Sequence, residues 1–246
     1  MRRDERKGGS LAESMPTADP RLILPLDLPT RKDAEQLIER LDGAISFFKI
    51  GLQLLASDGM ALARDLKGQG YDLFLDWKLH DIGATVEKAT AAVVASGACD
   101  FLTVHAQPQV LKAAVRGRDG DKAAKILGVT VMTSLTEDDL KDMGYGLGVT
   151  ALVERRIRQC LDAGADGVIA SPHEAAMARA IGGEGFLVVT PGVRPAWSGK
   201  DDQARAASPA EALKSGASHL VCGRPITAAS DPRAAALKVV EEMAGV

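Results

Sequence analysis

The chain has 246 residues, the usual length of one (β/α)₈ barrel and more than a small binding module needs. Its 46% hydrophobic and 26% charged residues are typical of a globular protein, and an aromatic share of only 4% predicts a core of Ala, Val, Leu and Ile. The net charge of −3 gives no reason to expect nucleic acid or an anionic membrane as a partner.

Residues 1–20 are predicted to be a flexible N-terminal extension, ahead of a single catalytic domain at 21–246. The extension begins with charged residues and lacks the apolar stretch of a secretory signal. No apolar run in the chain approaches the roughly 18 residues of a membrane span. Cys99, Cys160 and Cys222 have neither disulfide nor metal-ligand spacing, so we expect reduced, buried thiols in a cytoplasmic protein.

From residue 21 onward, short β-prone runs alternate with amphipathic helical stretches. The predicted strands are Leu22–Asp27, Phe47–Gly51, Tyr71–Asp76, Phe101–His105, Lys125–Val131, Gly167–Ala170, Phe186–Thr190 and His219–Gly223. The predicted helices include Arg31–Leu41, Gly59–Lys67, Val86–Ser96, Thr150–Ala163, His173–Ile181, Pro209–Lys214 and Pro232–Met243. Helix-ending glycines are expected at Gly70, Gly97, Gly164 and Gly216.

This alternation predicts an α/β fold, a single closed (β/α)₈ TIM barrel with a parallel sheet. A doubly wound open sheet is the alternative. Such a sheet should carry a glycine-rich turn after its first strand, and the segment P-L-D-L-P-T here is no such turn.

Polar side chains stand at the C-terminal ends of the predicted strands, where barrel enzymes carry their chemistry. The segment D-W-K-L-H-D, Asp76 to Asp81, is the sharpest example. Asp76 and Lys78 should project from the same side of the strand, with Asp81 just beyond it. Two acids beside a lysine can keep it charged and oriented, as a proton donor requires. The alternative to a catalytic role is a surface loop with exposed ion pairs.

A phosphate site is predicted where the last strand ends. Gly223 and Arg224 precede Pro225, which suits the first turn of a short helix, and glycine amides, a helix N-terminus and an arginine together bind phosphate. The alternative is a helix start with a solvated arginine. The long polar loop at 191–207, which contains Trp197 and Gln203, is predicted to be a lid, against a merely disordered connection.

The strand-end motifs together resemble those of the orotidine 5′-phosphate decarboxylase family. They read L-D, F-K-I-G, D-x-K-x-x-D-I, T-V-H-A, T-S-L, T-P-G-V-R, D-D-Q-A-R and V-C-G-R-P-I-T, in this order from about Leu24 to Thr227. The resemblance implies a (β/α)₈ barrel that forms a homodimer with active sites at the interface. It also implies a cofactor-independent lyase of pyrimidine biosynthesis that decarboxylates orotidine 5′-phosphate to uridine 5′-phosphate.

The same resemblance implies a role for individual residues. Lys49, Asp76, Lys78 and Asp81 would form the catalytic charge network, with Lys78 as proton donor to C6 of the pyrimidine and Asp81 reaching into the neighbouring subunit. Asp27 and Lys49 would bind the ribose, helped by Thr85 of the partner subunit, and Thr133 and Ser134 would lie near the base. The phosphate would be contacted by Arg194, Gln203, Gly223 and Arg224. The chain departs from the family pattern at Gly83-Ala84, where Pro-Asn is usual.

Two other functions are compatible with parts of the sequence. A metal-dependent sugar-phosphate decarboxylase or aldolase of the same superfamily also carries D-x-K-x-x-D, but its second strand bears an acid that binds magnesium, whereas this chain has Lys49. A non-catalytic phosphate-binding barrel would leave the charged cluster without chemistry to perform. His80, His105, His173 and His219 show no metal-ligand spacing, so neither metal nor cofactor is expected.

Overall fold

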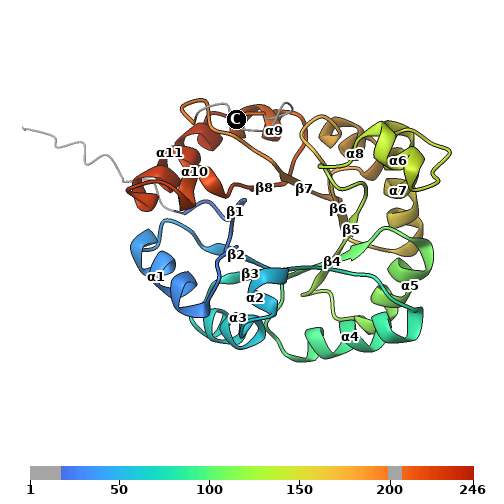
Figure 1. Ribbon diagram of the computed structural model, residues 1–246, viewed down its shortest axis with the longest axis horizontal. Coiled ribbons are helices and arrows are strands. Elements are labelled where there is room, and N and C mark those ends of the chain that lie inside the picture. Colours follow the sequence, from blue (N-terminus) through green and yellow to red (C-terminus); the bar gives the residue numbers. More distant parts are fainter. Residues whose placement is uncertain (1–17, 199–206) are drawn as a thin grey trace, which may run out of the picture.

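The computed structural model describes residues 18–198 and 207–246. Within them, parallel strands pair in chain order and close into a barrel, with the helices in a ring outside it (Figure 1). The strands are β1 (Leu22–Pro25), β2 (Phe47–Gly51), β3 (Asp72–Leu79), β4 (Phe101–His105), β5 (Lys125–Val129), β6 (Gly167–Ile169), β7 (Leu187–Pro191) and β8 (His219–Val221). Because β1 pairs with β8, Ile23 opposite Val221, the predicted closed barrel is confirmed and the open sheet is excluded.

Helices connect the strands and follow the last one, and several of them begin or end at residues that suit helix termini. They are α1 (Arg31–Leu41), α2 (Leu52–Leu55), α3 (Gly59–Gly68), α4 (Gly83–Ala95), α5 (Pro108–Gly117), α6 (Glu137–Asp142), α7 (Val149–Ala163), α8 (Ala175–Gly182), α9 (Pro209–Lys214), α10 (Arg224–Thr227) and α11 (Pro232–Ala244). Ser208 and Glu211 form a capping box at the start of α9. All four glycines predicted to end helices have a positive φ, as at Gly164, where φ is 79°.

The elements differ from the prediction in which helices form and in several of their bounds. Helices α2, α5 and α6 were not among those predicted, and α4 begins three residues early, at Gly83. Strand β3 continues past Asp76 to Leu79. The predicted extension at 1–20 lies almost wholly outside the described residues.

The core has two parts, one on each side of the strands. The larger part packs the outer strand faces against the helices and consists mainly of Ala, Val, Leu and Ile, as predicted. The barrel interior is different, because Phe47, Phe74 and Phe101 fill it together with smaller apolar residues from the other strands. Phe47 and Phe101 meet edge to face, with ring centroids 4.9 Å apart. The aliphatic core expected from composition is therefore wrong for the interior, since three of the five phenylalanines are concentrated there.

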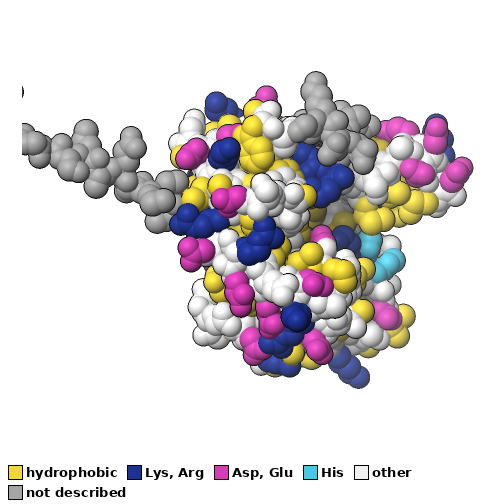
Figure 2. All heavy atoms as spheres, turned by 60° about the vertical axis from the view of Figure 1, so that its left-hand side comes forward, with side chains coloured by type: hydrophobic (Ala, Val, Ile, Leu, Met, Phe, Trp, Pro, Cys, Tyr) yellow, Lys and Arg dark blue, Asp and Glu magenta, His cyan; other side chains and the backbone are white. Residues whose placement is uncertain are grey.

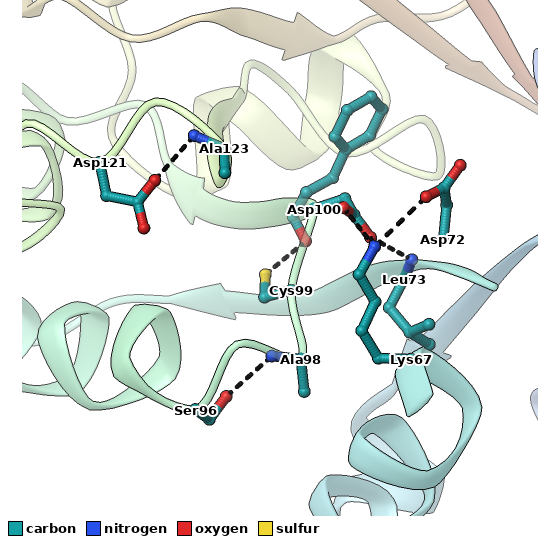
Figure 3. A network of polar contacts seen from close by, with 10 residues as sticks. Lys67, Asp72, Leu73, Ser96, Ala98, Cys99, Asp100, Asp121 and Ala123 are labelled. Atoms are coloured by element: carbon teal, nitrogen blue, oxygen red, sulfur yellow. Dashed lines mark hydrogen bonds and ion pairs between the residues drawn. The ribbon is translucent and has the colours of Figure 1, made fainter. Parts of the chain in front are cut away.

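An ion-pair network ties β3 and β4 together at the N-terminal end of the barrel (Figure 3). The ammonium of Lys67, on α3, lies 2.7 Å from both carboxylate oxygens of Asp100 and 3.3 Å from Asp72. Asp100 also accepts the backbone N–H of Leu73 at 2.7 Å. These contacts are at the end opposite to the predicted site, so we assign them to stability.

None of the helices described combines the length and the apolar character that would be needed to cross a membrane. All three cysteines are buried and free, as predicted, and burial raises the pKa of each thiol to about 12.

Candidate active site

The site is one layer of inward-facing residues above the aromatic interior. Alternate residues of a strand face the same side, so the residue two positions after each interior residue also faces the barrel axis. On β2, β3 and β4 these are Lys49, Asp76 and Thr103, which follow Phe47, Phe74 and Phe101. Polar groups therefore lie directly above an apolar floor.

Four charged side chains from three neighbouring strands form a chain of alternating charge. Lys49 Nζ lies 3.3 Å from Asp27 Oδ1 and 3.3 Å from Asp76 Oδ2. Lys78 Nζ lies 2.8 Å from Asp76 Oδ1. The order is Asp27, Lys49, Asp76, Lys78, so each lysine contacts a carboxylate and the central carboxylate contacts both lysines. The Lys49 side chain is only 9% exposed and that of Asp76 only 14%, so solvent screens these charges weakly.

Asp76 remains ionised although it is buried. Burial alone would raise the pKa of this carboxyl. The positive charges of Lys49 and Lys78, with hydrogen bonds from Lys78 and Thr103, outweigh burial and leave the pKa below its usual value. The site therefore holds a fixed negative charge between the two lysine side chains.

Lys78 reaches Asp76 from an irregular part of β3. Its φ is 49°, in the left-handed region that side-chain-bearing residues rarely adopt. The pairing of β3 with β4 shifts between Leu75 and Leu79, which face Leu102 and Val104. Four positions on β3 thus correspond to two on β4, which is a β-bulge. Bulges near active sites re-aim side chains, and this one carries Lys78.

Two adjoining cavities share Lys49, Asp76 and Lys78. The larger, of about 460 Å³, is lined by Asp27, Lys49, Asp76, Lys78, Arg194, Gly223 and Arg224 among others. The second, of about 220 Å³, contains Thr133 and Ser134 and is otherwise lined mainly by apolar side chains such as Val129, Met132 and Ile169. Figure 2 shows lysine and arginine side chains gathered at a hollow in the surface, with histidines near its edge. The combined space is polar at one end and apolar at the other.

The structure brings most of the predicted site residues to these cavities, but not all of them. Asp81, just before α4, and Thr85, in the first turn of α4, are exposed and do not line either cavity. Asp81 Oδ1 accepts the backbone N–H of Ile82 at 2.6 Å, so Asp76 is the acid that pairs with Lys78 in this chain. Gln203 lies outside the described residues.

The histidines lie beside the site. The His80 and His105 rings pack with centroids 4.8 Å apart, next to Arg156 and Tyr145 in a cavity of about 160 Å³. Burial, together with the nearby charges of His80, Arg156 and Lys78, lowers the pKa of His105. In residues 18–198 and 207–246, no group of three or more His, Cys, Asp or Glu side chains is placed to ligate a metal.

Sequence reasoning missed two residues that shape the charge network. Thr103 donates to Asp76 Oδ1 at 2.9 Å, and an added Cβ at Gly51 would lie 2.9 Å from Asp27 Oδ1 and 3.2 Å from Lys49 Nζ. Both residues stand inside motifs read from the sequence, T-V-H-A and F-K-I-G. The two-residue alternation that places Lys49 and Asp76 in the barrel would also have placed Thr103 there.

The chain has clear relatives among known proteins. A model of the Orotidine 5′-phosphate decarboxylase / HUMPS family matches residues 20–239. An orotidine 5′-phosphate decarboxylase from Caulobacter vibrioides is 66% identical, over 94% of this chain and 100% of its own length. Another from Rhodopseudomonas palustris is 52% identical, over 92% and 95%. A crystal structure of orotidine 5′-phosphate decarboxylase from Lactobacillus acidophilus superposes with a TM-score of 0.81 at 35% identity, covering 92% of this chain and 99% of that one.

Proposed function

Since this chain belongs to the Orotidine 5′-phosphate decarboxylase / HUMPS family, we propose that it is a carbon–carbon lyase that converts orotidine 5′-phosphate to uridine 5′-phosphate and CO₂. This reaction is the last step of de novo pyrimidine nucleotide synthesis. The proposed substrate is a small nucleotide. We propose neither nucleic acid nor a membrane as a partner. Three reduced thiols suit work in the cytoplasm.

The observation that carries the proposal is the alternating charge chain. Breaking the bond between C6 and the carboxylate leaves an electron pair on C6, so the site must supply positive charge at that carbon. Lys78 lines both cavities, with its side chain 32% exposed and its ammonium held by Asp76. The electron pair on C6 takes a proton from Lys78, CO₂ leaves, and the neutral amine recovers a proton from solvent.

The two ends of the combined cavity suit the two ends of the substrate. Apolar walls beside Thr133 and Ser134 offer a place for the pyrimidine base. Lys49 lines both cavities and Asp27 lines the larger one, so both are placed to contact a ribose between the base and the phosphate. Gly223, Arg224 and Arg194 would hold the phosphate, and the buried Arg194 Nε has no hydrogen-bond partner among the described residues.

The position of Lys49 is evidence against the activity of the metal-dependent sugar-phosphate relatives. Its Nζ lies 3.3 Å from both Asp27 and Asp76, and it stands on the second strand, where those relatives carry the acid that binds magnesium. A fixed ammonium at that position repels a metal ion by ordinary Coulomb interaction. A phosphate-binding barrel without catalysis would also bury this network with no chemistry to perform.

We further propose a homodimer in which Asp81 and Thr85 complete the site of the partner subunit. Both side chains are exposed, and neither residue lines the two cavities of its own subunit. Ile82, between them, is 68% exposed and would be covered at such an interface. Met132 and Met143 are also exposed and line the neighbouring histidine cavity, which extends the apolar surface available to a second copy.

The test is a spectrophotometric assay with orotidine 5′-phosphate after exhaustive chelation. The absorbance change of decarboxylation should appear at the same rate with and without chelator. An enzyme that loses activity to the chelator and regains it with magnesium would belong with the sugar-phosphate relatives. Purified protein that binds uridine 5′-phosphate and never turns over the substrate would leave only the phosphate-binding barrel.

A further inference from the structure

The β-bulge leaves one backbone group of β3 without its ordinary ladder partner. In a regular parallel pair, strand N–H groups donate to carbonyls of the neighbouring strand. Between Leu75 and Leu79 this ladder is interrupted. The N–H of Lys78 donates instead to the side-chain oxygen of Thr103, on β4, at 3.0 Å. A side chain of the neighbouring strand therefore holds the backbone of Lys78 in its left-handed conformation.

The same hydroxyl binds the carboxylate that pairs with the Lys78 ammonium. Thr103 Oγ1 lies 2.9 Å from Asp76 Oδ1. Since the Lys78 N–H can only donate, Oγ1 accepts that bond and directs its own hydrogen to the carboxylate. Asp76 Oδ1 in turn lies 2.8 Å from Lys78 Nζ. The hydroxyl, the carboxylate and the two ends of Lys78 thus form a closed ring of hydrogen bonds.

Thr103 is itself a member of this ring of hydrogen bonds. The residue is 0% exposed, and its hydroxyl uses its donor once and its acceptor once inside the ring. Thr103 lines neither of the two cavities that hold the charge chain, so it is placed to act on the substrate through Asp76 and Lys78. Strained backbone at a functional residue persists only when its surroundings over-determine it.

From these contacts we infer that Thr103 is a positioning residue of the decarboxylase site, which locks the Lys78 backbone and the Asp76 carboxylate into one rigid proton-donating unit. The inference rests on the proposed function for what the unit does, and on the contacts above for how it is held. Valine at position 103 would keep the shape, but it would leave the Lys78 N–H without its acceptor and Asp76 without one donor.

The loss should appear in turnover rather than in substrate affinity. Misplacing a proton donor affects the transition state, whereas the phosphate contacts lie elsewhere in the cavity. In Thr103→Val we expect kcat to fall roughly ten- to a hundredfold, the range for losing a hydrogen bond to a charged group, with KM within about threefold of wild type. Because the Thr103 hydrogen bond helps to lower the pKa of Asp76, the acidic limb of the kcat profile should move to higher pH.

Two further variants separate positioning from general packing. Thr103→Ser keeps the hydroxyl and should restore most of kcat. Thr130→Val is the matched control, because Thr130, just after β5, is also fully buried, and its hydroxyl donates to a backbone carbonyl, that of Ile169, at 2.9 Å. This control should keep the wild-type acidic limb, whatever its effect on thermal stability.

Amide hydrogen exchange provides a readout that does not depend on turnover. The Lys78 amide should exchange at least about tenfold faster in Thr103→Val than in wild type or Thr103→Ser. Unchanged kcat and unchanged exchange in Thr103→Val would overturn the inference, and so would a fall in kcat that serine fails to restore. A wild-type protein that is inactive on orotidine 5′-phosphate would instead overturn the proposed function, while the exchange result would still report on the ring.

Discussion

Lys78 and Asp76 are two positions apart on β3, yet Lys78 Nζ and Asp76 Oδ1 lie 2.8 Å from each other. In a regular strand, residues at this spacing are about 6.6 Å apart along the chain and their side chains run side by side. Here the left-handed backbone of Lys78 departs from that geometry, and the charged ends meet at the cavity. This contact is the basis of the first prediction.

Replacing Lys78 by alanine should abolish nearly all turnover while leaving the fold intact. The variant loses both the cation near C6 and the proton, so kcat should fall by roughly three orders of magnitude or more. Affinity for uridine 5′-phosphate, measured by calorimetry, should change little because the phosphate contacts remain. Lys88→Ala, at an exposed position of α4, is the control and should behave as wild type. A Lys78→Ala enzyme that keeps a tenth of wild-type kcat would contradict the assignment.

Replacing Arg224 by alanine should weaken the enzyme selectively toward phosphorylated substrate. Arg224 lines the larger cavity beside Gly223, and a charge-assisted contact contributes about 1.5–3 kcal/mol. KM for orotidine 5′-phosphate should therefore rise by roughly one to two orders of magnitude. Steady-state kinetics with the unphosphorylated nucleoside, run beside it, should show kcat/KM within about twofold of wild type. Equal losses on both substrates would place Arg224 outside the phosphate site.

Mixing two inactive variants should regenerate activity if the sites are shared between subunits. Lys78→Ala and Asp81→Ala are each expected to be inactive as homodimers. After random exchange half of the dimers are hybrids, and one of the two sites in each hybrid carries no substitution, so about a quarter of all sites should recover. The experiment needs an independent label that proves exchange. With exchange proven, continued inactivity would mean that Asp81 acts within its own chain.

We expect His219 to make the free energy of unfolding depend on pH, independently of catalysis. Its ring packs against Phe101 at 5.0 Å between centroids and against Phe47 at 6.0 Å, and burial lowers its pKa to about 4. The unfolded chain, with the ordinary value of 6.5, binds a proton first as the pH falls. The free energy of unfolding should therefore decrease between pH 6.5 and 4, by roughly 3 kcal/mol from this residue.

The measurement is denaturant unfolding at a series of pH values. His219→Phe keeps an aromatic ring in the cluster and should lose this part of the slope, whereas His173→Gln, at an exposed position, should retain it. Asp19 and Arg21 are the charged neighbours of His219, and they act in opposite directions on its pKa. An unchanged slope in His219→Phe would show that other groups dominate acid unfolding.

Much of the fold and of the site follows from local patterns in the sequence. The alternation of elements predicted the barrel, because parallel strands require long crossover connections. The C-terminal ends of parallel strands meet at one rim, so Asp27, Lys49 and Asp76 could be expected to converge. Their distances confirm this convergence.

Other features depend on contacts that the sequence does not display. The bulge at Lys78 depends on how β3 pairs with β4, and the spacing D-W-K looks the same in a regular strand. The overall aromatic fraction could not show that Phe47, Phe74 and Phe101 share one interior. The missed helix α5 is a different case, because Pro108 at its start and Val110, Leu111 and Ala114 at helical spacing were visible signals.

The three interior phenylalanines also determine by which route the substrate and the products enter and leave the site. Phe47, Phe74 and Phe101 are at most 7% exposed and fill the barrel axis beneath Lys49 and Asp76. The cavity is therefore blind-ended, and substrate, CO₂ and product nucleotide must all use the mouth at the C-terminal rim. Product that lingers there blocks the next substrate, so the time that uridine 5′-phosphate occupies the mouth sets an upper limit on the turnover rate.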